Sequence, residues 1–170
     1  VLQAIKKSGG IELEYASKEL RADREVVLQA VAHEFSIGCL GNASKELRAD
    51  REVVLQAAKN NGWALKHVSE GLKADKEIVL EAVTNNGWEI EFASDELKND
   101  REVVLTAIRS SKDARYGKSI FEFASEALRN DREVVLEAIK NCGWALKFAS
   151  EELRNDREIL LKAIKKVVPV

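Results

Sequence analysis

The sequence predicts an all-α protein, specifically an α-solenoid of about six helix-turn-helix repeats of 25 residues each. One observation is a motif in which an aspartate follows a serine by six residues, and another is the helical spacing of the aliphatic residues around it. Each predicted helix is also too short to be stable alone, so neighbouring units must share a core. The motif serines are Ser17, Ser44, Ser69, Ser94, Ser125 and Ser150, and the aspartates are Asp23, Asp50, Asp75, Asp100, Asp131 and Asp156.

The spacing of this motif divides the chain into repeats. Successive serines are 27, 25, 25, 31 and 25 residues apart, which places short insertions near 35–41 and 110–119. We predict one solenoid over 1–170. Because 1–9 match the second half of a unit, we expect more repeats or a partner to cover that end. The predicted units are a partial repeat, 1–9, and full repeats over 10–36, 37–61, 62–86, 87–117, 118–142 and 143–167.

Each repeat is expected to contain two helices of about ten residues. In the fourth repeat, Ile90, Ala93 and Leu97 follow the i, i+3, i+7 spacing of a helix face. Asp100 then provides an N-cap for a second helix, which begins Arg-Glu-Val-Val-Leu. In several repeats this helix ends at Asn-x-Gly, where glycine permits a left-handed C-cap.

The composition excludes several classes of protein. With 33% charged residues, 45% hydrophobic residues and one proline, the chain is neither disordered nor collagen-like. The formal net charge of -2 does not support a globally basic nucleic-acid-binding protein. No apolar run is long enough to cross a membrane, and no secretory signal is visible. Cys39 and Cys142 are too few for a disulfide framework, so a reducing compartment (cytoplasm or organelle interior) is expected.

A basic residue separates aspartate from glutamate in every motif. The two acidic residues are explained by capping and by the helix dipole, but a cation in the first turn is unfavourable there. We therefore expect a structural ion ladder, in which each cation pairs with a carboxylate of the preceding helix or of a neighbouring unit; ligand binding is the alternative. The candidate edge-ladder residues are Arg24, Arg51, Lys76, Arg101, Arg132 and Arg157, with expected partners such as Glu19, Glu46, Glu96 and Glu152.

A second row of cations stands at the end of each first helix, where the dipole favours positive charge. Together the two rows form an edge that could bind nucleic-acid phosphates. The motif aspartates and glutamates lie along the same edge and cancel most of its field, so nucleic-acid binding is disfavoured. The second row comprises Arg21, Arg48, Lys73, Lys98, Arg129 and Arg154.

Aromatic residues recur at two positions of the repeat, four residues apart. Spacing of this kind is typical of core residues, so we expect the rings to fill the joints between units; a stacking platform for bases or a peptide is the alternative. His67 replaces one of these rings, and no ligand stands at metal-binding spacing from it. The rings are Trp63, Trp88 and Trp144 at the first position and Tyr15, Phe92, Phe123 and Phe148 at the second.

The longer insertion is the best local candidate for a contact site, because loops that interrupt a regular array tend to project from it. It is basic and carries a tyrosine. A tolerated, solvated loop is the alternative interpretation. The candidate contact residues are Lys112, Arg115, Tyr116 and Lys118.

The segment Asn60–Leu80, which reads Asn-Asn-Gly-Trp-Ala-Leu-Lys-His-Val-Ser-Glu-Gly-Leu-Lys-Ala-Asp-Lys-Glu-Ile-Val-Leu, resembles the repeat of a family catalogued as domain of unknown function 4116. The resemblance extends over essentially the whole chain and is weaker around the two insertions. It implies a tandem-repeat fold. The family has no established activity, cofactor or catalytic residue, so none is carried over.

The motifs favour a binding protein over an enzyme. We find no phosphate-binding glycine loop, catalytic triad or paired-carboxylate cleft, and we expect no catalytic residue, cofactor or metal. We therefore expect a non-catalytic protein–protein interaction scaffold with protein partners. The alternatives are a peripheral structural subunit of a large assembly and, less favoured, a nucleic-acid-binding protein that uses the basic edge.

Overall fold

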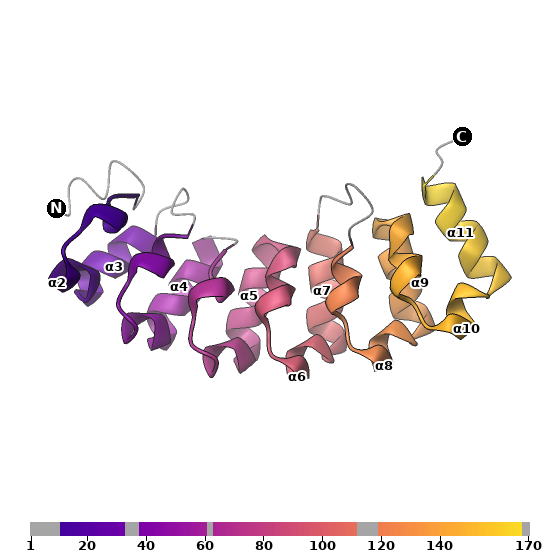
Figure 1. Ribbon diagram of the computed structural model, residues 1–170, viewed down its shortest axis with the longest axis horizontal. Coiled ribbons are helices and arrows are strands. Elements are labelled where there is room, and N and C mark those ends of the chain that lie inside the picture. The colour runs from indigo at the N-terminus through magenta and orange to yellow at the C-terminus, as the bar shows by residue number, and fades with distance from the viewer. Residues whose placement is uncertain (1–10, 33–37, 61–62, 112–118, 168–170) are drawn as a thin grey trace.

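The computed structural model describes residues 11–32, 38–60, 63–111 and 119–167, and every regular element in these ranges is helical. The repeats follow one another in a single extended row, with the first and last described repeats at opposite ends (Figure 1). The predicted all-α repeat fold is therefore confirmed. Parts of the two predicted insertions, 33–37 and 112–118, lie outside the described residues.

One long helix in each repeat forms a continuous layer with its neighbours. It follows the motif aspartate directly and carries three consecutive aliphatic residues, Val-Val-Leu in four of the repeats, and the first two of these side chains are buried in the interior repeats. Each long helix packs against the next along the row. The long helices are α3 (Arg24–Val31), α4 (Arg51–Asn60), α5 (Lys76–Asn85), α7 (Arg101–Ser110), α9 (Arg132–Asn141) and α11 (Arg157–Val167).

The first half of each repeat differs from our expectation, because the expected ten-residue helix is two shorter segments. A 3₁₀ helix comes first, in η1 (Ile11–Tyr15), η2 (Cys39–Asn42), η4 (Leu65–His67), η6 (Gly87–Phe92), η7 (Ile120–Phe123) and η8 (Gly143–Phe148). A single helical turn follows, in α2 (Lys18–Arg21), η3 (Leu47–Ala49), η5 (Leu72–Ala74), α6 (Asp95–Lys98), α8 (Glu126–Arg129) and α10 (Glu151–Arg154).

The break falls at two extended residues, the motif serine and the alanine before it. In the fourth repeat Ala93 (φ −66°, ψ 157°) ends the 3₁₀ helix, and Ser94 (φ −61°, ψ 157°) follows it. Its hydroxyl accepts a hydrogen bond from the backbone N–H of Leu97 and begins the next turn. The apolar residues keep their helical spacing across the break, and this spacing is why the sequence predicted one continuous helix.

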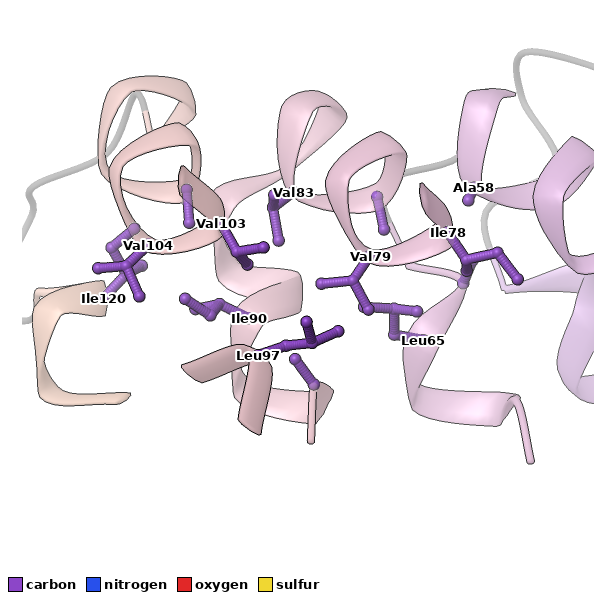
Figure 2. Packing of buried hydrophobic residues seen from close by; sticks show 14 of the residues in the cluster. Ala58, Leu65, Ile78, Val79, Val83, Ile90, Leu97, Val103, Val104 and Ile120 are labelled. Atoms are coloured by element: carbon purple, nitrogen blue, oxygen red, sulfur yellow. The ribbon is translucent and has the colours of Figure 1, made fainter. Parts of the chain in front are cut away.

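The core runs along the row between the long helices and the 3₁₀ helices. Figure 2 shows Val104 of α7 beside Ile120 of the next repeat, and both side chains are buried. Val79, Ile90 and Val103 are fully buried in the same way. Apolar contacts therefore cross every joint, and no repeat completes a core of its own.

Within the described ranges, no helix combines the length and the apolar character needed to cross a membrane.

Candidate functional site

The motif aspartate uses its two carboxylate oxygens for different purposes. In Asp100, Oδ1 accepts the N–H groups of Glu102 and Val103 at 2.9 and 3.1 Å and caps α7. Its other oxygen, Oδ2, lies 2.7 Å from Nζ of Lys76 in the preceding repeat. One side chain thus caps its own helix and ties that helix to its neighbour.

The same arrangement recurs at each described joint, where one cation contacts an aspartate and a glutamate of the following repeat. At the first, Arg24 Nε lies 3.0 Å from Asp50 and its Nη2 lies 2.5 Å from Glu52. The other rungs are Arg51 to Asp75 and Glu77, Lys76 to Asp100 and Glu102, Arg101 to Asp131 and Glu133, and Arg132 to Asp156 and Glu158.

The structure corrects the expected partners of this ladder. We expected the cations to pair with carboxylates such as Glu19, Glu46, Glu96 or Glu152, whereas they contact the Asp-x-Glu carboxylates of the next repeat. The long helices lie side by side, so the first turn of one faces the first turn of the next. Hydrogen bonding to Arg24 lowers the pKa of Asp50, and the bonds to Asp50 and Glu52 raise the pKa of Arg24. The favourable charge contacts are reciprocal.

The end of the row leaves this pattern incomplete. Within the described residues, Arg157 forms no ion pair, and neither do Asp23 and Glu25 in the first described repeat. Each interior repeat therefore supplies one cation to the joint with the following repeat and two carboxylates to the joint with the preceding repeat. The first described repeat supplies only the cation, and the last described repeat supplies only the carboxylates.

The second row of cations folds back onto the protein. Arg21 Nε donates to the carbonyl of Ala16 at 2.9 Å and its Nη2 donates to the carbonyl of Glu14 at 2.9 Å. Nε of Arg48 and of Arg129 is buried and has no hydrogen-bond partner among the described residues. The guanidinium group of Arg21 thus binds carbonyl groups in and just after the 3₁₀ helix η1.

Sequence reasoning missed two further ties between repeats. From the second repeat on, the N–H of the motif serine donates to the carbonyl of the second-row cation one repeat earlier, as from Ser94 to Lys73 at 3.0 Å and from Ser125 to Lys98 at 3.0 Å. An asparagine near the end of a long helix also donates to the end of the preceding long helix, as from Asn85 Nδ2 to the carbonyl of Ala58 at 2.8 Å. The recurring asparagine was the visible signal for the second tie.

A buried carboxyl group lies in the joint between the third and fourth repeats. Glu89 is fully buried, and its Oε2 accepts the N–H of Leu65 at 2.6 Å. Its Oε1 has no hydrogen-bond partner among the described residues. Burial raises the pKa of Glu89 to about 7. Ala64 and Ala145 occupy the equivalent position in other repeats, so alignment of the copies could have revealed it.

The aromatic rings only partly match the expectation that they fill the joints. Trp88 packs edge-on against Phe123 of the next repeat, with ring centroids 6.4 Å apart. In contrast, the exposed fractions of Trp63, Trp144 and Tyr15 are 44%, 52% and 80%. Trp144 lies in the last repeat, where no described repeat follows to cover it. His67 is partly buried, and this burial, followed by Lys66 and Arg48, lowers its pKa.

The last repeat carries an exposed apolar face, which we call the end face and define as Trp144, Leu160, Ile164 and Val167. The equivalents of Leu160 and Ile164 in the fourth repeat, Val104 and Ile108, are 1% and 2% exposed because the fifth repeat covers them. The end face surrounds an open hollow of about 380 Å³.

The candidate contact residues Lys112, Arg115, Tyr116 and Lys118 lie outside the described residues. Over the described ranges, no group of three or more His, Cys, Asp or Glu residues is placed to hold a metal ion. Cys39 and Cys142 are buried, and neither is in a disulfide.

These features define a class of protein, the tandem helical-repeat proteins, in which each unit is completed by its neighbour. A family model described as a domain of unknown function, DUF4116, matches residues 1–38, 34–73, 75–129, 114–153 and 131–167. The chain therefore belongs to the DUF4116 family, in tandem copies, and the resemblance inferred from Asn60–Leu80 is confirmed. No curated protein and no solved structure matches the chain.

Proposed function

We propose that this protein is a non-catalytic scaffold that binds other proteins through its helical repeats. The observation that carries the proposal is the distribution of exposed apolar side chains. Of the large hydrophobic residues that are exposed in the described ranges, most belong to the last repeat. A concentrated apolar patch on an otherwise charged surface is typical of a protein-binding site.

The ion ladder supports a protein partner over a nucleic acid. Each cation that faces a following repeat contacts two carboxylates, so a rung carries net negative charge. Such a row repels phosphates, whose binding depends on unpaired lysine and arginine. Nucleic-acid binding along this edge therefore ranks below protein binding.

Permanent membership of a large assembly is the second candidate function, and the same end face favours it. A scaffold exposes this face between binding events, whereas a subunit keeps it covered. The two functions differ in the lifetime of the complex, and an isolated chain that stays monomeric and soluble at high concentration counts against the subunit.

The test is a native affinity purification of the whole protein, with and without nuclease. The wild type is compared with a Leu160→Glu/Ile164→Glu double variant, with Tyr15→Glu as a matched control at the other end of the row. An Arg115→Ala/Tyr116→Ala variant tests the candidate contact loop. We expect the wild type and Tyr15→Glu to recover the same partner protein at a fixed ratio to the chain, with or without nuclease. Recovery that disappears on nuclease treatment, or no stoichiometric protein at all, contradicts the proposal.

A further inference from the structure

The joint between the second and third repeats has a small open hollow beside the second row of cations. The hollow measures about 250 Å³ and is lined by Lys45, Arg48, His67, Val68 and Ser69. The first two residues belong to the second repeat, and the other three belong to the third. Three of the five side chains can carry positive charge, and none carries negative charge. The hollow is therefore a candidate site for a small anion.

Two polar groups on this hollow lack the contacts that their counterparts make. Nε of Arg48 is buried and has no hydrogen-bond partner among the described residues, whereas Nε of the equivalent Arg21 donates to a carbonyl at 2.9 Å. The N–H of Leu72 donates to the backbone carbonyl of Ser69, instead of to the hydroxyl as at the other motif serines. A buried guanidinium N–H without an acceptor is unfavourable, so an incoming oxygen atom would stabilise it.

The residue after the motif serine explains why positive charge gathers at this joint. In the third repeat this residue is Glu70, whose Oε1 lies 2.6 Å from Nζ of Lys73, the second-row cation of the same turn. The second repeat has Lys45 at this position, so Arg48 stands beside another cation. Neither of these two side chains forms an ion pair among the described residues. The position is acidic in every later repeat, as Glu70, Asp95, Glu126 and Glu151.

His67 brings a third positive group to the hollow. Phenylalanine occupies its position in the last three repeats. The imidazole lies against Gly41 of the second repeat, where an added Cβ would be 3.0 Å from Cε1 and Nδ1 of the ring. The missing side chain at Gly41 thus lets the ring approach the second repeat. Burial, followed by the charges of Lys66 and Arg48, lowers the pKa of His67, so the guanidinium group acts on the ring across the joint.

The joint between the fifth and sixth repeats provides a contrast within the same chain. Nε of Arg129 is also buried there without a partner among the described residues. However, Glu126, Ser150 and Glu152 line the hollow at that joint, and Phe148 takes the place of the histidine. The two joints share a buried guanidinium group, and only the one between the second and third repeats surrounds it with positive charge.

We propose that the hollow between the second and third repeats binds a phosphate monoester, carried by a phosphoserine side chain or by a small phosphorylated metabolite. A monoester has a charge of about −1.5 to −2 at pH 7 and three acceptor oxygens. This charge matches two permanent cations and one titratable ring better than the single charge of a carboxylate or a phosphodiester does. Arg48 donates to the phosphate oxygens, Lys45 adds a point charge, and the bound dianion favours the imidazolium form of His67. The site is separate from the end face and does not depend on the scaffold function.

The test is an NMR titration of the full isotope-labelled chain with two probes, the blocked peptide acetyl-Ala-phosphoserine-Ala-amide and glycerol 3-phosphate. We expect saturable shifts of the Arg48 Nε–H and His67 ring resonances, from which the Kd is obtained, and weaker binding as salt rises. The probe that binds more tightly identifies the source of the phosphate as a protein side chain or a free metabolite.

The variants take their residues from other repeats of the chain, so each introduced side chain already occurs at that position of the fold. Lys45→Glu introduces the acidic residue of the third repeat and should weaken binding at least about tenfold. Lys18→Glu makes the same change in the first repeat and, as the matched control, should bind like the wild type. His67→Phe should weaken binding about fivefold. Circular dichroism checks that each variant keeps its helical content.

Undiminished binding of both probes to Lys45→Glu and His67→Phe overturns the proposal, and so does the absence of saturable shifts with either probe. Equal binding of a peptide with glutamate in place of phosphoserine shows a site for any anion and also overturns it. Tighter binding of oligothymidylate than of either monoester, abolished by Lys45→Glu, identifies the phosphodiester backbone of a nucleic acid instead.

Discussion

The fourth and sixth repeats have nearly the same sequence pattern but present different surfaces. Ile108 in the fourth repeat is 2% exposed, and its equivalent Ile164 in the sixth is 50% exposed. Lys76 and Arg101, on either side of the joint between the third and fourth repeats, are both paired, whereas Arg157 forms no ion pair among the described residues. Each repeat therefore encodes only half of each interface. Equivalent substitutions should have unequal effects on stability in interior and end repeats.

The largest difference is expected at the glycine that begins the 3₁₀ helix. A Cβ added at Gly87 would lie 2.2 Å from the carbonyl oxygen of Ala107, whereas at Gly143 the closest atoms are Val167 Cγ2 at 2.6 Å and the carbonyl oxygen of Ala163 at 2.8 Å. Among the described residues, α7 packs between two long helices, whereas α11 packs against one. Gly87→Ala should therefore lower the free energy of unfolding by about 4 kcal/mol, and Gly143→Ala by about half as much. Urea unfolding measures both values, and equal losses would contradict the comparison.

The buried carboxyl group makes the joint before the fourth repeat sensitive to pH. The pKa of Glu89 is raised to about 7 from an ordinary value near 4.5, so the folded chain holds a proton that the unfolded chain releases between these two values. Stability should therefore fall as pH rises from about 4.5 to 7, and then stay lower by about 3 kcal/mol.

Glu89→Gln removes this titration, since the amide oxygen can still accept the N–H of Leu65. The variant should match the wild type near pH 5 and exceed its stability at pH 8, as measured by thermal unfolding across this range. The converse change, Ala145→Glu in the last repeat, should introduce a pH dependence of the same sign. A wild type whose stability is constant between pH 5 and 8 would refute the assignment.

The smallest effect is expected at the aspartate caps. Asp100→Ala removes both the cap of α7 and the contact with Lys76, for about 2 kcal/mol, while Asp23→Ala removes the cap of α3 alone, for about 1 kcal/mol. High salt screens the contact between exposed charges but leaves the cap. The two losses should therefore converge in 1 M salt. Equal losses already at low salt would show that the ladder adds nothing to the cap.

Much of this architecture is visible in the sequence because it repeats. Six copies of Ser and Asp at constant spacing predict the row of long helices, and the caps follow from the chemistry of aspartate. Segment lengths were harder to predict. The helical spacing of Ile90, Ala93 and Leu97 persists across a break at which Ala93 and Ser94 are both extended.

The partners of the ladder cations could not be found from one repeat, because they lie on the next helix and depend on the step between units. The exposure of Trp144 and Ile164 is likewise a property of position in the row, since both occupy slots that elsewhere face another repeat. Glu89 stands out only when the copies are aligned, where Ala64 and Ala145 take its place.

The hydrogen bond from a motif serine to the repeat before it joins main-chain atoms, so it does not depend on which side chains either unit carries. The bond from Ser125 to Lys98 spans the longer insertion and has the same length as the bond from Ser94 to Lys73, 3.0 Å. Extra residues inserted between two units therefore lengthen the chain without removing this tie between them.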